Sequence, residues 1–138
     1  MEELDLDKIK NGKSKNIKIG ELNSNVIDLL GLDLKPQNIN IWSPRLQEHC
    51  EKHKKEYSTV TAYTNAIKSI PKIIGEPDFV GLHKENGNIQ YIKRLDDISL
   101  IGIKILKGKG GLLFRTIFPI TEDKLNHYIK TNRIIPYK

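Results

Sequence analysis

Two histidines one helical turn apart are the residues whose types and spacing point most directly to chemistry. They lie in the segment 43–53, where Ser43 followed by Pro44 predicts the start of a helix. Both fall on an inward-facing stripe with i, i+3, i+4, i+7 spacing, formed by Leu46, His49, Cys50, His53 and Tyr57. Burying an imidazole is costly unless a partner satisfies it. The pattern therefore predicts a cleft on this face of the helix.

Histidines at this spacing are also found in zinc sites. The metalloprotease pattern needs a glutamate directly after the first histidine, and this chain has Cys50 there. A third ligand would have to be His83, His127, Cys50 or a distant carboxylate, and none stands at a recognisable spacing. We therefore expect no metal and no cofactor, and keep a small zinc protein as an alternative.

Composition and length favour one soluble domain. The chain has 138 residues, of which 38% are hydrophobic, and a mean hydropathy of −0.46. We expect a polar N-terminal tail over residues 1–16 and a single domain over residues 17–138. No apolar run approaches the roughly 20 residues that span a bilayer. The single cysteine excludes an intrachain disulfide and fits the cytoplasm, although a toxin module delivered into a target cell's cytoplasm would look the same.

The positive charge is confined to the second part of the chain. Residues 1–83 carry equal numbers of acidic and basic side chains, whereas residues 84–138 hold the whole net charge of +6. Such asymmetry favours a polyanionic partner, of which nucleic acid is the commonest. The alternative is a solvated basic surface with no dedicated partner.

The predicted elements are helices first and a sheet second. Short strands are expected at 17–19 and 39–41, with a small helix between them that Asn23 or Ser24 caps and Gly31 closes. A further helix is expected from about Thr59 to Ile70, interrupted by Pro71.

Four strand-like runs follow at 79–83, 89–95, 98–106 and 112–120, and the turn Asn86-Gly87 separates the first two. No helix fits between them, and short connections demand antiparallel neighbours. A closing helix begins after Thr121. The predicted fold is therefore α+β, with N-terminal helices packed on a four-stranded antiparallel meander and a closing C-terminal helix.

Strand alternation places polar and cationic side chains in mid-sheet. Tyr91 and Lys93 share one face of their strand. In the last strand, Phe114, Thr116 and Phe118 share one face, and Leu113, Arg115 and Ile117 the other. Arg115 and Thr116 therefore cannot both face one groove unless a bulge intervenes. We expect Thr116 to face the groove and keep Arg115 as the alternative. Lys107 and Lys109, in the glycine-rich turn before this strand, would contact a phosphate backbone.

The order of these elements resembles the nuclease domains of the phage-associated Barnase–EndoU–Colicin E5/D–RelE (BECR) superfamily. The resemblance runs from about Ile17 to Tyr137. Its most specific pieces are the His-x-x-x-His helix and the Pro77-Asp78-x-Val80 entry into the meander.

The resemblance implies a metal-independent ribonuclease, toxin-like, that acts on tRNA or another RNA. It implies site residues His49, His53, Lys93, Arg115 and Thr116. We expect an acidic inhibitor or immunity protein as a further partner, and we expect no binding to membranes.

The chemistry expected is attack of the 2′-hydroxyl of RNA on its own phosphate, with histidine as the general base and a cation stabilising the phosphate charge. Tyr91 would stack a base, and Phe118 would line the substrate groove. The alternative is a non-catalytic nucleic-acid-binding or regulatory module on the same fold, in which the histidines belong to the core.

Overall fold

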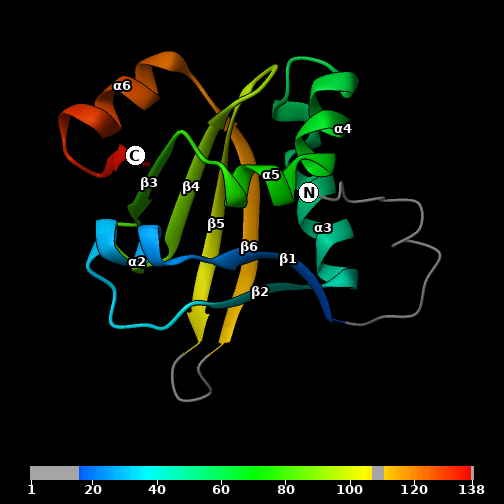
Figure 1. Cartoon of the computed structure of the whole chain (residues 1–138). Coiled ribbons are helices and arrows are strands. Elements are labelled where there is room, and N and C mark those ends of the chain that lie inside the picture. The colour runs from blue at the N-terminus through cyan, green and yellow to red at the C-terminus, as the bar shows by residue number, and fades with distance from the viewer. Residues whose placement is uncertain (1–15, 107–110, 138) are drawn as a thin grey trace.

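The computed structural model describes residues 16–106 and 111–137, and Figure 1 shows how their elements are arranged. In chain order the elements are β1 (Asn16–Leu22), α2 (Ser24–Leu30), β2 (Gln37–Trp42), α3 (Ser43–His53), the 3₁₀ turn η1 (Lys54–Glu56), α4 (Val60–Lys68), α5 (Ile70–Gly75), β3 (Phe79–Leu82), β4 (Ile89–Arg94), β5 (Ile98–Leu106), β6 (Gly111–Ile120), α6 (Glu122–Lys130) and β7 (Ile134–Pro136). The fold is α+β.

The described strands form one seven-stranded sheet in the order β1-β2-β6-β5-β4-β3-β7. The four predicted runs are present as β3 to β6 and pair as consecutive antiparallel neighbours. The prediction of a four-stranded sheet is wrong, because strands are added at both edges. β2 pairs in parallel with β6 through Ile39 opposite Leu112 and Asn40 opposite Leu113, and β1 pairs with β2. β7, for which no strand was predicted, pairs antiparallel with β3.

Pro71 has a different effect from the one predicted. We expected it to interrupt the last turn of a helix, yet α4 ends at Lys68 and a new helix, α5, starts at Ile70 with Pro71 in its first turn. A proline lacks the amide hydrogen that the first turn of a helix leaves unbonded, so the position suits it. α5 is thereby free to cross the sheet in its own direction, as Figure 1 shows.

One face of the sheet, here called face A, is buried by helices. Its strand residues are Val80, Ile89, Tyr91, Ile101, Ile103, Phe114 and Ile117, each at most 2% exposed. Against them pack Leu46 of α3, Ile67 of α4 and Ile73 of α5, all fully buried. In Figure 1, α5 and β1 pass in front of the central strands. Face A therefore holds the main hydrophobic core.

Among the described helices, α6 packs on part of the opposite face, here called face B. Ile92, Leu100 and Phe118 on this face join a second apolar cluster with Leu125 and Tyr128 of α6. Beyond α6 the same face presents polar and small residues, which are Gln90 of β4, Gly102 of β5 and Thr116 of β6. Within residues 16–106 and 111–137, the sheet therefore offers an open polar surface beside α6.

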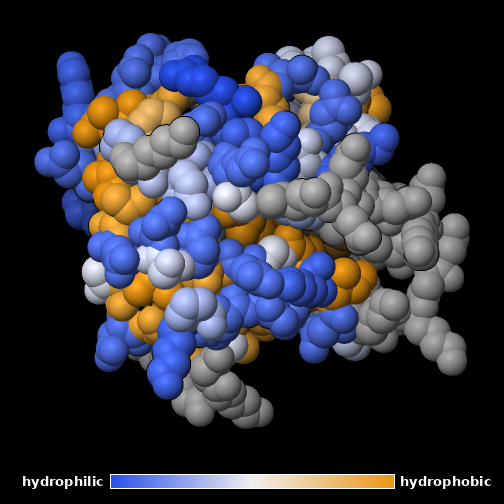
Figure 2. All heavy atoms as spheres, viewed as in Figure 1, coloured by the Kyte–Doolittle hydropathy of each residue, from blue (hydrophilic) through white to orange (hydrophobic). Residues whose placement is uncertain are grey.

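The surface in view in Figure 2 is mostly hydrophilic, with hydrophobic patches along the side where α2 lies near β3. Within residues 16–106 and 111–137, every helix is too short or too polar to cross a membrane.

We predict that Gly81→Ala destabilises the fold. A Cβ at this position of β3 would lie 2.1 Å from the backbone carbonyl oxygen of Arg133, so the two chain segments would have to separate. Overpacking of this kind costs about 1–3 kcal/mol of unfolding free energy, which urea denaturation would measure. In Gly111→Ala the nearest atom would be 3.4 Å from the new Cβ, so this control should be nearly neutral. Equal stability of the two variants would contradict the prediction.

Candidate active site

A cavity of about 250 Å³ opens on the uncovered part of face B. Its floor is the sheet, through Gln90, Gly102 and Thr116, and its rim comes from α3 and from the turn between β3 and β4. The described lining residues are Lys52, His53, His83, Asn86, Asn88, Gln90, Leu100, Gly102, Arg115, Thr116 and Phe118. None of these is acidic. The cavity is therefore polar, contains histidines and is suited to an anion.

A β-bulge in β6 directs Arg115 and Thr116 to the same cavity. Gly102 pairs with Thr116 and Ile103 pairs with Phe114, so Arg115 is the extra residue that has no partner on β5. Such a bulge breaks strict alternation. Both side chains line the cavity. The sequence analysis treated Arg115 and Thr116 as alternatives for the groove, and the structure brings both to it. The predicted placement of Phe114 beside Thr116 is wrong, because Phe114 is buried on face A.

His53 lies at the last residue of α3 and is held from two sides. Its ring stacks against Phe118, with centroids 5.6 Å apart and a tilt of 41°. Its Nδ1 contacts the carboxylate of Glu56 in η1. A carboxylate on one ring nitrogen orients the imidazole and leaves the other, Nε2, for proton transfer. His53 therefore faces the cavity, and its contact with Phe118 positions the ring.

His83 was not predicted as a catalytic residue, although it lines the same cavity. Its Nδ1 accepts hydrogen bonds from the backbone N–H groups of Glu85, at 3.1 Å, and Asn86, at 3.4 Å. Gly87, with φ +73°, closes this tight turn. Because Nδ1 accepts, the neutral ring carries its proton on Nε2. His83 therefore presents an N–H donor. Its position two residues after Gly81 on β3 was the available signal, since alternation places it on face B.

The structure does not bring Tyr91 and Lys93 to this cavity. They follow Gln90 and alternate with Ile92, so they occupy face A. Tyr91 is fully buried and its hydroxyl has no hydrogen-bond partner among the described residues. The Nζ of Lys93 donates to the backbone carbonyl of Glu76 at 2.6 Å and lies 3.8 Å from Asp78. The expectation that these two residues share a groove with His53 is therefore corrected.

Some predicted site residues lie outside the described part of the structure. The backbone of His49 and Cys50 belongs to α3, but their side chains are not described, and neither are Lys107 and Lys109. Their predicted roles stay predictions.

A second, open groove continues the cavity towards the ends of β5 and β6. It encloses about 530 Å³ and shares Asn86, Asn88 and Arg115 with the cavity, to which it adds Lys104. Neither Arg115 nor Lys104 has a carboxylate partner among the described residues. Unpaired cations along a groove attract a chain of phosphates. Among those same residues, no group of three or more histidine, cysteine, aspartate or glutamate side chains is placed to hold a metal ion.

The chain is thus an α+β protein whose sheet carries a cavity lined by histidine and arginine side chains. Comparison with protein-family models matches residues 17–127 to the family described as phage-Barnase-EndoU-ColicinE5/D-RelE like nuclease 3. The match covers most of the chain, so the chain belongs to this family of BECR-like nucleases, and the resemblance in the sequence is confirmed. No curated protein and no solved structure matches it significantly.

We predict that Tyr91→Phe maintains or raises stability. Burial, and secondarily the charge of Tyr137, raise the pKa of the Tyr91 hydroxyl, and a buried hydroxyl without a partner opposes folding by about 1–3 kcal/mol. Removing it should increase the unfolding free energy in urea by up to about 1 kcal/mol.

The sign of the pH dependence follows from the same shift. A tyrosine whose pKa is raised on folding stabilises the folded state less as pH rises through the unfolded value of about 10. Wild type should therefore lose more stability than Tyr91→Phe between neutral pH and pH values above about 10. A clear loss of stability in the variant at neutral pH would show that the hydroxyl has a partner.

Proposed function

We propose that this protein is a metal-independent endoribonuclease that cleaves RNA by attack of the 2′-hydroxyl on the adjacent phosphate. The observation that carries the proposal is the convergence of His53, Arg115 and Thr116 on one cavity lined by no described acidic residue. Membership of a nuclease family supports a nucleolytic activity in general. The histidine–cation chemistry supports RNA in particular, because RNA supplies its own nucleophile and no metal-activated water is required.

His53 is the proposed general base. Glu56 on Nδ1 fixes the ring and stabilises the imidazolium that forms when Nε2 takes the 2′ proton. Contact with Phe118 limits the rotation of the ring. The same division of labour, one nitrogen held by a carboxylate and the other reacting, operates in carboxylate–histidine pairs of many hydrolases.

Arg115 and two hydrogen-bond donors are proposed to stabilise the phosphate as negative charge develops. The Arg115 guanidinium suits two phosphate oxygens at once. The Thr116 hydroxyl and the Nε2–H of His83 supply neutral donors from different sides of the cavity. Pre-oriented donors of this kind are usually the largest contribution to catalysis.

The remaining step is departure of the 5′ oxygen. Lys52, on the rim of the cavity one residue before His53, is the proposed proton donor. The products are a 2′,3′-cyclic phosphate and a 5′-hydroxyl end. We further propose a toxin-like role on cytoplasmic RNA, including tRNA, which the phage theme of the family supports. An acidic inhibitor protein would complement the basic groove.

We predict cleavage of total RNA or tRNA by the purified chain in EDTA, with cyclic phosphate at the new 3′ ends. His53→Ala should lower the rate by about 10²- to 10⁴-fold, the usual contribution of a general base. Gel electrophoresis of RNA, with mass spectrometry of the ends, would measure both.

The control is Lys130→Ala, which removes an exposed side chain of α6 outside all of the described cavities and should leave the rate within about twofold of wild type. Salt-sensitive RNA binding without any cleavage would favour the binding-module alternative. Cleavage abolished by EDTA and restored by a metal would contradict the proposed mechanism.

We also predict that Glu56→Gln and Arg115→Gln both lower kcat. Glu56→Gln should reduce it about 10- to 100-fold, because the amide no longer stabilises the imidazolium. Arg115→Gln should reduce it about 10²-fold or more, through lost charge stabilisation. Arg94→Gln is the control, since Arg94 is exposed and paired with Glu122, and should stay within about twofold of wild type. An Arg115→Gln rate equal to that of Arg94→Gln would remove Arg115 from the site.

A further inference from the structure

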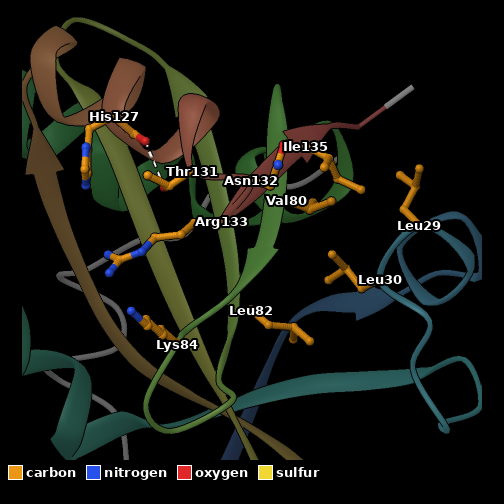
Figure 3. Close-up of a pocket in the computed structure, with 10 residues that line it drawn as sticks. All are labelled: Leu29, Leu30, Val80, Leu82, Lys84, His127, Thr131, Asn132, Arg133 and Ile135. Carbon is orange, nitrogen blue, oxygen red and sulfur yellow. Dashed lines mark hydrogen bonds between the residues drawn. The ribbon is translucent and has the colours of Figure 1, made fainter.

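A larger cavity of about 700 Å³ lies outside the candidate active site, among α2, β3 and the segment that joins α6 to β7 (Figure 3). A hydrogen bond of 2.8 Å from Asn23 Nδ2, at the start of α2, to the hydroxyl of Tyr137 fastens α2 to the C-terminal segment beyond β7. The cavity is therefore bounded by segments that are held together, and its size is within the range of small-molecule sites.

The two sides of this cavity differ in chemistry. Leu29, Leu30, Leu82 and Ile135 form an apolar side, drawn on the right in Figure 3. Arg133, Lys84 and His127 lie on the other side, and Figure 3 shows the Arg133 guanidinium and the Lys84 amine extending into the same space. A ligand that fits must be apolar at one end and anionic at the other.

The cations of this cavity are not neutralised. Arg133 lies over the ring of Tyr128, 5.4 Å from its centroid, which holds the guanidinium in place without using its hydrogen-bond donors. Neither Arg133 nor Lys84 pairs with a carboxylate among the described residues, and none of the described lining residues is acidic. A guanidinium and an ammonium that line the same cavity match a phosphate group.

The cavity adjoins the candidate active site through one turn. His83 lines the active-site cavity and Lys84, the next residue, lines the larger one. The two cavities therefore lie on either side of the same turn after β3.

We propose that this cavity is a second nucleotide subsite, which binds a phosphate of single-stranded RNA between Arg133 and Lys84 and a flanking base against Leu29, Leu30 and Leu82. The proposal rests on the proposed ribonuclease function, which makes RNA the polymer in the neighbouring cavity. A nucleotide carries both a planar apolar group and a phosphate, which match the apolar and the cationic side of the cavity.

The test measures binding separately from cleavage. The full chain is titrated into a fluorescent single-stranded RNA whose 2′-O-methyl groups prevent cleavage, at several salt concentrations. Arg133→Gln and Lys84→Gln should each weaken binding about three- to tenfold and reduce the salt slope by about one. Lys130→Gln, an exposed lysine on α6 outside all of these cavities, should change affinity less than about twofold. Lys84→Gln alters an exposed side chain, so this arm remains informative if Arg133→Gln fails to fold.

A second measurement addresses the base. Titration with a nucleoside 5′-monophosphate should shift the methyl resonances of Leu29, Leu30 and Leu82, and inorganic phosphate should leave them unchanged. Affinities of both variants equal to that of Lys130→Gln would overturn the subsite even if wild type cuts RNA. Loss of RNA affinity in both variants would support it even if no cleavage is found. A third arm uses an oligoglutamate peptide as competitor. If the peptide binds more tightly than the RNA and displaces it, the nucleotide subsite is overturned in favour of an acidic protein partner.

Discussion

The site depends on a single extra residue in one strand. Phe114 and Ile117 are three positions apart, so in a regular strand they would point to opposite faces, yet both are buried on face A. The bulge at Arg115 resolves this conflict, since it restores the phase of the strand after one unpaired residue. The core gains two large side chains, and Arg115 and Thr116 reach the opposite surface together. The geometry of the candidate active site is in this sense a consequence of packing on the other side of the sheet.

The two faces of the sheet are used for different purposes. Face A is covered by α3, α4, α5 and β1 and provides the apolar burial that stabilises the fold. Face B is covered by α6 at one end only, where Ile92, Leu100 and Phe118 pack on it. Phe118 lies at the boundary, since it joins that apolar cluster and contacts the ring of His53. The polar residues of face B lie next to the area on which α6 packs, and the strands of the sheet hold them in position.

Turn residues and hydrophobic periodicity predicted the helices and strands well, but they predicted less well which face of the sheet each side chain occupies. The meander and the helix that carries His53 follow from turn residues and periodicity, and both are present. Tyr91 and Lys93 were placed with Thr116 because alternation shows only which residues of a strand share a face. The register between strands decides which face that is, and here Tyr91 lies opposite Ile101 in the core.

The same limit applies to the edges of the sheet. β7 is three residues long, and its pairing with β3 depends on where α6 returns the chain, which no local signal gives. His83 differs, because alternation from Gly81 places it on face B, and the two hydrogen bonds that Nδ1 accepts from the turn then fix its ring. The sequence shows that Arg115 and Thr116 can share a groove only if a bulge intervenes. Whether and where β6 has that bulge depends on the packing of Phe114 and Ile117 on face A.

The chain order of the cavity residues has a consequence for the protein as it is synthesised. α3, with His53, is made before β6, the last strand of the meander, to which Arg115, Thr116 and Phe118 belong. β2, which leads into α3, joins the rest of the sheet only by pairing with that same strand. A nascent chain therefore has no assembled site until β6 has emerged and paired. Pairing between strands so distant in sequence is intrinsically slow, because a long loop has to be closed first. The topology itself thus delays the chemistry until synthesis of the domain is nearly complete.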